Sequence, residues 1–141
     1  MTTSLSRRTL VMAGAGLCTT PLLVACAARP QLGKPVSVGA LFAGRVDDKG
    51  FMESGWRGLE RARTELGAQT TFIDRIEPKK ELLVAALTQL AQSGVALVVA
   101  HGGQNNEACA EVAARFPAVK FVVTQGAVTA PNLASYDVLQ E

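Results

Sequence analysis

Residues 95–103 read Val-Ala-Leu-Val-Val-Ala-His-Gly-Gly. The first six are all apolar, so a strand formed by them has apolar side chains on both of its faces. This pattern is typical of a central strand in a parallel sheet, which helices cover on both sides. The run stops at His101 and two glycines, which predicts a loop at the carboxyl end of the strand. The stretch therefore indicates an α/β fold.

A helix is predicted before this strand. Apolar residues recur at three- and four-residue steps over residues 82–91, and Gly94 closes the pattern. Pro78 suits the first turn of this helix, where its missing N–H is no loss.

A second helix is predicted after the strand. Its apolar stripe covers residues 108–116, and Pro117 ends it. Asn105 or Asn106 is expected to cap its N-terminus. Cys109 falls on the stripe and is expected to be a small buried residue.

The predicted elements alternate along the whole chain after residue 35. Strands are expected at 36–42, 69–73, 95–100, 119–123 and 133–138, and helical stripes at 52–66, 82–91 and 108–116. Right-handed crossovers then place helices on both faces of a parallel sheet. The sequence therefore predicts a three-layer, doubly wound α/β domain with a Rossmann-like order, in which the mixed-polarity strand 69–73 lies near an edge.

Folds of this kind bind ligands beyond the carboxyl ends of their strands, where the strand order reverses. The loops at 43–50, 101–104 and 124–127 are therefore the candidates for a binding site. Gly102-Gly103 could let backbone amides approach a ligand oxygen. His101, the single histidine of the chain, could equally bind a solute or hold its own loop.

Other residues near these loops also have two interpretations. Asp47 and Asp48 could contact a ligand, or they could be turn residues before a helix N-terminus, where the helix dipole favours carboxylates. Phe51 could be an aromatic platform or core packing, and Trp56 is expected in the core.

The N-terminus has the pattern of an export signal. Arg7-Arg8 precedes an apolar segment at 10–24, and small residues then lead to Cys26. Residues 6–10 resemble a twin-arginine signal, and residues 23–26 resemble the lipobox of bacterial lipoproteins. We therefore expect a signal peptide at 1–25, a lipid on Cys26, a tether at 26–35 and a single folded lobe at 36–141.

Composition and charge exclude several classes of protein. The 141 residues are 48% hydrophobic and 18% charged, which is typical of one globular domain. The basic residues number 14, and without Arg7 and Arg8 they number 12, against 12 acidic residues. This balance gives no basic surface for nucleic acid. Outside the N-terminus, no apolar run approaches the roughly 18–20 residues of a membrane-spanning helix.

The chain contains no recognisable catalytic or cofactor motif. The motifs Gly-x-Ser-x-Gly, His-Glu-x-x-His and the phosphate-binding loop are all missing from the sequence. One histidine and, after residue 26, one cysteine also argue against a zinc site. No catalytic residue, metal or cofactor is therefore predicted.

Short motifs throughout residues 36–141 occur in the order and spacing of one bacterial family. They are Val38-Gly39, Asp47-Asp48-Lys49-Gly50-Phe51, Gly58-Leu59, Glu65-Leu66-Gly67, Leu90-Ala91-Gln92-Ser93-Gly94, Val112-Ala113-Ala114-Arg115-Phe116-Pro117, Val119-Lys120-Phe121 and Pro131-Asn132-Leu133-Ala134-Ser135-Tyr136. In these motifs the chain resembles the basic membrane protein family. Its members are PnrA-like, nucleoside-type solute-binding lipoproteins of ABC importers with a type I periplasmic-binding fold.

The resemblance implies a fold of two lobes with a solute held in the cleft between them. This chain is then expected to be the N-terminal lobe, with the second lobe absent after Glu141. The expected partners are a nucleoside-like solute, an ABC permease and, through the lipid, the extracytoplasmic face of the cell membrane.

The same resemblance assigns roles to individual residues. Asp47 or Asp48 would accept hydrogen bonds from sugar hydroxyls or a base edge, and Phe51 would stack on the base. The other implied solute contacts are Met52, His101, Gly102, Gly103, Gln104, Gln125 and Gly126.

Three of these positions depart from the family pattern. Met52 replaces a common Asn, His101 with the two glycines replaces a small or aromatic turn, and Gln125 replaces a frequent acid. The solute could therefore be something other than a nucleoside.

Two alternative interpretations stay open. One is a lobe that binds no ligand, and the other is an exported nucleotide-binding α/β domain. Paired acids after the first strand also occur in phosphorylation domains, but those need an aspartate at the end of the third strand, where this chain has Ala100-His101.

The lipid anchor is tested by replacing Cys26. Cys26→Ser should leave the mature protein unanchored, because the serine hydroxyl cannot form the thioether to the lipid. The measurement is the membrane-bound fraction after alkaline washing. A Cys26→Ser variant that still sediments with membranes would contradict the prediction.

Overall fold

A computed structural model describes residues 34–137, so the predicted signal at 1–25 and most of the tether at 26–35 lie outside the described residues. The elements are β1 (Ser37–Phe42), α1 (Phe51–Leu66), β2 (Gln69–Ile73), α2 (Lys80–Gln92), β3 (Leu97–His101), a 3-10 turn η1 (Gly103–Asn105), α3 (Asn106–Arg115), β4 (Lys120–Thr124) and β5 (Leu133–Tyr136). Within residues 34–137, no helix is long and apolar enough to cross a membrane.

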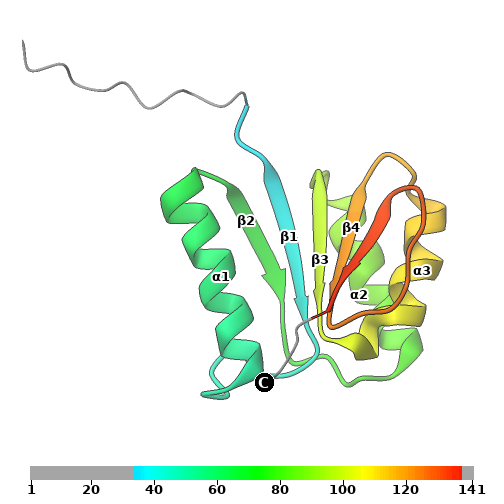
Figure 1. Ribbon diagram of the computed structural model, residues 1–141, viewed down its shortest axis with the longest axis horizontal. Helices are drawn as coiled ribbons and strands as arrows, with labels where there is room; N and C mark the ends of the chain where they lie inside the picture. The colour runs from blue at the N-terminus through cyan, green and yellow to red at the C-terminus, as the bar shows by residue number, and fades with distance from the viewer. Residues whose placement is uncertain (1–33, 138–141) are drawn as a thin grey trace, which may run out of the picture. The chain divides into compact units, whose positions relative to one another are not determined.

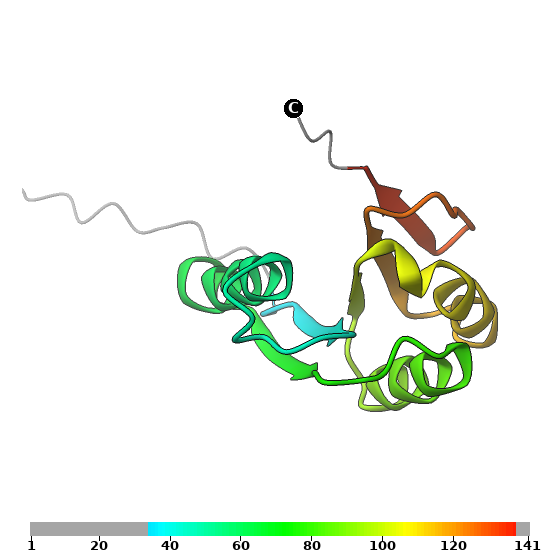
Figure 2. The same cartoon turned by 90° about the horizontal axis from the view of Figure 1, so that it is seen from below.

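The five strands form one parallel sheet in the order β2-β1-β3-β4-β5, and their arrowheads point to the same edge (Figure 1). Figure 2 shows α1 on one face and α2 with α3 on the other. This confirms the three-layer, doubly wound α/β fold, with β3 in the centre and β2 at an edge. The strand order reverses between β1 and β3, which is where such sheets bind ligands.

The main core lies between the sheet and the helices α2 and α3. Leu87, Val98 and Val112 are completely buried there, as is Cys109. Burial raises the pKa of the Cys109 thiol to about 12, so it stays protonated and unreactive at neutral pH. A smaller core lies on the α1 side, around Phe42 and Leu59.

One prediction about helix ends is wrong, since Pro78 lies outside α2, which begins at Lys80. The other is confirmed in part. Asn105 occupies the N-cap position of α3, but its side chain makes no capping hydrogen bond. The Asn105 amide instead donates to the carbonyls of His101 and Gly102, and the Asn106 Oδ1 accepts the Ala127 N–H at 3.1 Å. These side chains therefore stabilise the loops after β3 and β4.

Asn132 joins α3 to the start of β4 and β5. Its side-chain nitrogen donates to the carbonyl oxygens of Ala113, Phe116 and Val119 at 3.0, 3.1 and 2.9 Å, and the residue is only 8% exposed. Three acceptors converge on one amino group here. A carboxylate oxygen in place of this amino group could donate no hydrogen bond, so it would be repelled by the three carbonyl oxygens.

Asn132→Asp tests this role without changing the shape of the side chain. We expect the free energy of unfolding at pH 7 to fall by about 2–3 kcal/mol, because a buried carboxylate replaces the donor. Burial and the carbonyls raise the pKa of this carboxyl in the folded state, so its protonation restores stability as the pH falls and the loss grows as the pH rises. Urea unfolding at pH 4 and pH 7 measures both effects.

Asn106→Asp is the matched control, because the aspartate can still accept the Ala127 N–H. Equal decreases in the free energy of unfolding of the two variants would contradict the proposed role of Asn132.

Candidate functional site

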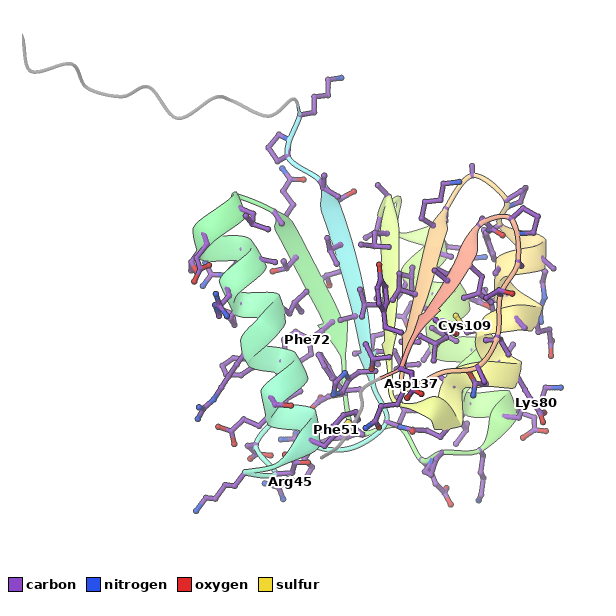
Figure 3. The ribbon with its side chains drawn as sticks, viewed as in Figure 1. Arg45, Phe51, Phe72, Lys80, Cys109 and Asp137 are labelled. Carbon is purple, nitrogen blue, oxygen red and sulfur yellow. The ribbon has the colours of Figure 1, made fainter. Side chains whose placement is uncertain are left out.

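The carboxyl edge of the sheet gathers most of the predicted site residues. The loops after β1, β3 and β4 all leave the sheet here, because parallel strands end at the same edge. Figure 3 shows Phe51 and Arg45 at this edge, and Asp137 also lies there, just after β5. The register pairs Phe42 with His101 and His101 with Thr124 across the three strand ends.

His101 and Phe51 form the centre of this edge. Their rings are stacked, with centroids 4.0 Å apart and an angle of 19° between planes. The imidazole Nε2 also lies 2.9 Å from the Phe51 carbonyl oxygen. The Phe51 ring, predicted to stack on a base, is therefore held at the first residue of α1 by another ring.

The other contacts of His101 fix its tautomer. The Phe51 carbonyl accepts from Nε2–H, so the Thr124 hydroxyl, 2.9 Å away, donates to Nδ1. Burial lowers the pKa of His101, although the Phe51 carbonyl and the Asp48 charge partly raise it. The imidazole is therefore neutral at neutral pH, and it connects β3, β4 and α1.

A glycine of α1 makes room for this imidazole. A side-chain carbon at Gly55 would lie 2.7 Å from the His101 ring, which is too close for any side chain. The helix can therefore approach the strand end only because residue 55 is glycine.

The loops after β3 and β4 touch each other beside the stack. The Gly102 N–H donates to the Thr124 hydroxyl at 3.0 Å. A side-chain carbon at Gly103 would lie 2.5 Å from the Gln125 carbonyl oxygen, so this contact also requires glycine. His101, Gly102, Gly103, Gln104, Gln125 and Gly126 are thus brought together, as the strand ends predicted.

Asp47 is exposed and pairs with its own loop. Its two carboxylate oxygens accept from Nε and Nη2 of Arg45 at 2.8 and 2.7 Å. The Arg45 guanidinium lowers the pKa of Asp47 to about 2. Exposed pairs of this kind contribute little to stability and can exchange partners at small cost.

Asp48 instead holds the start of α1. Its carboxylate accepts the backbone N–H groups of Gly50, Met52 and Glu53 at 2.8, 3.1 and 3.1 Å. Glu53 reaches back and accepts the Lys49 N–H at 3.0 Å, which resembles a capping box. These amides lower the pKa of Asp48. In this structure Asp48 therefore acts as a turn residue before the N-terminus of α1, which is the second of the two interpretations given above.

Met52 and Trp56 lie on the core side of α1. Both pack against the smaller core cluster. Trp56 also lines an open depression of about 530 Å³ around the first turn of α1, together with Asp47, Glu53 and Arg57. This depression and the His101–Phe51 stack are separate features of the same edge.

Backbone strain is concentrated at the carboxyl edge. Among the described residues, the non-glycine positions with positive φ are Lys49, Arg75 and Gln125, at 56°, 59° and 54°. Each lies in a loop that follows a strand, and such conformations often accompany binding sites.

Sequence reasoning missed several residues that build the edge, above all Thr124, Asn105 and Asn106. Thr124 was predicted only as the first residue of the loop at 124–127, whereas it ends β4 and pairs with His101. The asparagines were interpreted only as helix caps. Asn105 belongs to the turn that orders the loop after β3, and Asn106, the first residue of α3, holds the loop after β4.

The site offers stacking and hydrogen bonding. Backbone amides, a neutral imidazole, hydroxyl and amide groups lie beside an aromatic ring. Within residues 34–137, no three of the His, Cys, Asp and Glu residues come together as metal ligands. Such a surface is suited to holding a small polar molecule.

Two solved structures are similar to this chain in fold and in sequence. An ABC transporter system solute-binding protein from Conexibacter woesei is 26% identical with a TM-score of 0.66, over 72% of this chain and 35% of that chain. One from Aeropyrum pernix is 30% identical with a TM-score of 0.63, over 72% and 28% of the two chains.

A curated relative carries a different description. The transcriptional activator protein med of Bacillus subtilis is 25% identical over 114 residues, which are 81% of this chain and 36% of that protein. The chain therefore spans about a third of the length of the relatives it matches.

The family described as "Bmp: ABC transporter substrate-binding protein PnrA-like" matches residues 35–141, which include every described strand and helix. This confirms the resemblance inferred from the motifs. The chain belongs to the Bmp family of PnrA-like ABC transporter substrate-binding proteins, and it corresponds to the N-terminal lobe of their fold.

Proposed function

We propose that this lobe forms one wall of a solute site and that the protein delivers a nucleoside or a similar small polar solute to an ABC permease. The observation that carries the proposal is the His101–Phe51 stack at the reversal of strand order, in a chain of the Bmp family. In this function the solute is bound and released, and no bond is broken.

The aromatic platform would supply much of the contact area. One face of Phe51 packs on His101, so the ring is already ordered before a solute arrives. An ordered aromatic ring loses little entropy when a flat base stacks on it. The adjoining amides of the glycine loop and the side chains of Gln104 and Gln125 would then orient the polar groups of the solute.

The exposed Asp47 is the better candidate of the two acids for a sugar hydroxyl. Its partner Arg45 is 65% exposed, so a solute can compete with it, whereas the Asp48 oxygens already accept three N–H groups of α1. Closure by a second lobe would exclude water and strengthen these hydrogen bonds.

The predicted lipid on Cys26 would keep the lobe at the extracytoplasmic membrane surface, next to the permease. The residues between Cys26 and β1 would act as a short tether. This placement rests on the export-signal pattern and on the family.

A thermal-shift screen of the mature protein tests solute binding. The panel contains nucleosides, free bases, sugars and amino acids. A ligand that binds only the folded protein raises the melting midpoint with its concentration. We expect a saturable shift with nucleosides. A cooperative melt that no compound shifts would instead favour a lobe without a ligand.

Phe51→Ala tests the aromatic platform. We expect the affinity for the shifting compound to fall by about fivefold or more, since a stacked base contributes about 1–3 kcal/mol. Isothermal titration calorimetry measures the affinity.

Phe72→Ala is the control, because Phe72 is an exposed aromatic of β2 that contacts Phe42 instead of His101. Equal affinities of the wild type and Phe51→Ala would contradict the platform.

Asp47→Ala and Asp48→Ala should separate binding from folding. Asp48→Ala removes three hydrogen bonds at the start of α1, so it should lower the free energy of unfolding by about 1 kcal/mol. Asp47→Ala should leave the melting midpoint nearly unchanged and weaken solute binding. The melting midpoint and the affinity are measured for both variants, and unchanged affinity in Asp47→Ala would exclude Asp47 from the site.

A further inference from the structure

Thr124 ends β4 directly beside His101. The two residues are register partners, so their side chains lie next to each other at the carboxyl edge of the sheet. Thr124 is half-buried, and His101 is only 7% exposed. The hydroxyl of Thr124 contacts two groups here, the Gly102 N–H at 3.0 Å and the His101 Nδ1 at 2.9 Å. One hydroxyl therefore joins the end of β4 to the last residue of β3 and to the loop that follows it.

Backbone groups at both ends set the direction of these hydrogen bonds. The Gly102 N–H can only donate, so the Thr124 oxygen accepts it. The Phe51 carbonyl can only accept, so the imidazole proton lies on Nε2. The hydroxyl proton of Thr124 then points to the unprotonated Nδ1. The chain of donors therefore runs from Gly102 through Thr124 and His101 to Phe51.

Both ring nitrogens of His101 are used inside the lobe. Burial lowers the pKa of this histidine, so the neutral imidazole has one N–H to donate and one lone pair to accept a hydrogen bond. Phe51 takes the N–H, and Thr124 donates to the lone pair. A solute could reach either nitrogen only by breaking one of these bonds. His101 is therefore placed to act on a solute through the residue that it holds.

Phe51 is the residue that His101 holds. The imidazole Nε2 lies 2.9 Å from the Phe51 carbonyl oxygen, and the two rings stack with centroids 4.0 Å apart. Ser54 also donates to this carbonyl, at 2.7 Å. Both Phe51 and Ser54 belong to the first turn of α1, so that bond orients Phe51 only within its own helix. The imidazole is the group that connects the Phe51 backbone and ring to β3.

The orientation of the imidazole depends on Thr124. A half turn about the Cβ–Cγ bond would exchange each ring nitrogen with a ring carbon, so Thr124 and Phe51 would both lose their hydrogen-bond partner. The ring has little room on the helix side, because it fills the place of a side chain at Gly55. On the strand side it meets the hydroxyl of Thr124, whose oxygen is fixed by the Gly102 N–H. The hydroxyl therefore favours the ring orientation that meets Phe51.

We propose that Thr124 is a positioning residue of the solute site, whose hydroxyl holds the His101 imidazole in the orientation that keeps the Phe51 ring in place. This inference rests on the proposed function, in which Phe51 stacks on the base of a nucleoside. Thr124 itself makes no solute contact in this arrangement, because its hydroxyl already serves Gly102 and His101. Its effect on a solute passes through the Phe51 ring.

The same chain of hydrogen bonds couples two parts of the site. Its first group is the amide of Gly102 in the glycine loop, and its last is the carbonyl of Phe51 at the start of α1. A solute that holds the glycine loop in place would also hold the Thr124 hydroxyl, and through it the imidazole. Contacts of the solute with the loop would therefore stabilise the aromatic platform as well.

The NMR resonances of His101 test the proposal without any solute. His101 is the only histidine of the chain, so all imidazole signals of the mature protein belong to it if the purification tag lacks histidine. The ring current of the stacked Phe51 should shift the carbon-bound protons of the imidazole upfield, and Phe51→Ala gives the reference without this shift. Thr124→Val keeps the size of the side chain but removes the hydroxyl, so we expect most of the shift to be lost at pH 7. Thr124→Ser should retain it, because serine restores the hydroxyl.

The affinity for adenosine, a purine nucleoside, tests the effect on the solute site. We expect Thr124→Val to lower it about threefold, the effect of one lost hydrogen bond, and Thr124→Ser to leave it nearly unchanged. In a double-mutant cycle, Thr124→Val should have almost no further effect once Phe51 is replaced by alanine, because a positioning residue acts only through that ring. Thr71→Val is the matched control, since Thr71 is an exposed threonine of the edge strand β2, and it should change neither the affinity nor the His101 resonances.

Three results would overturn the proposal. The first is a folded Thr124→Val variant whose His101 protons keep their upfield shift, and the second is a Thr124→Ser variant that loses it. The third is a loss of affinity on Thr124→Val that is the same with and without the Phe51 ring. Thr124→Ala, which also lacks the hydroxyl, takes the place of the valine variant if urea unfolding shows that the valine variant does not fold. Wild-type protein that does not bind adenosine would contradict the proposed nucleoside site, and the His101 resonances would still decide whether Thr124 positions Phe51.

Discussion

The central strand must be covered on both of its faces. Val98 and Ala100 of β3 point to the α2 and α3 side and are completely buried, while Leu97 and Val99 point to the α1 side. Because both faces of this strand are apolar, its burial favours helices on both sides of the sheet. The alternation of strands and helices and the common edge of all carboxyl ends agree with this requirement, and the right-handed twist of the strands sets the hand of the crossovers. The loops that form the candidate site are positioned in the same way.

Periodicity predicted the sheet well because it records which side chains are buried. Strand 69–73 and the helix end at Leu66 agree with the structure to the residue, and the other elements differ by one or a few residues. The hydrogen-bond partners of the polar side chains were harder to predict. Asn105 and Asn106 have the chemistry of helix caps, but the adjacent loops offered them buried carbonyl and amide groups instead. Such choices depend on tertiary contacts that local sequence does not contain.

In the candidate site too, the position of the residues was easier to predict than their contacts. Its position at the strand ends could be predicted from topology alone, and six of the proposed residues do meet there. The partners of Phe51 and Asp48 could not be predicted, because the ring faces a histidine fifty residues away and the carboxylate serves its own helix. His101 thus acts as a rigid connector, and its neutral form is set by burial.

The buried thiol of Cys109 makes the lobe convenient for chemical labelling. It is the only cysteine after residue 26, and its raised pKa keeps it from reacting with maleimides or iodoacetamides while the protein is folded. A single cysteine introduced at an exposed position of the carboxyl edge would therefore accept a fluorophore selectively. With Cys26 replaced, such a fluorophore would report changes in the surroundings of the carboxyl edge.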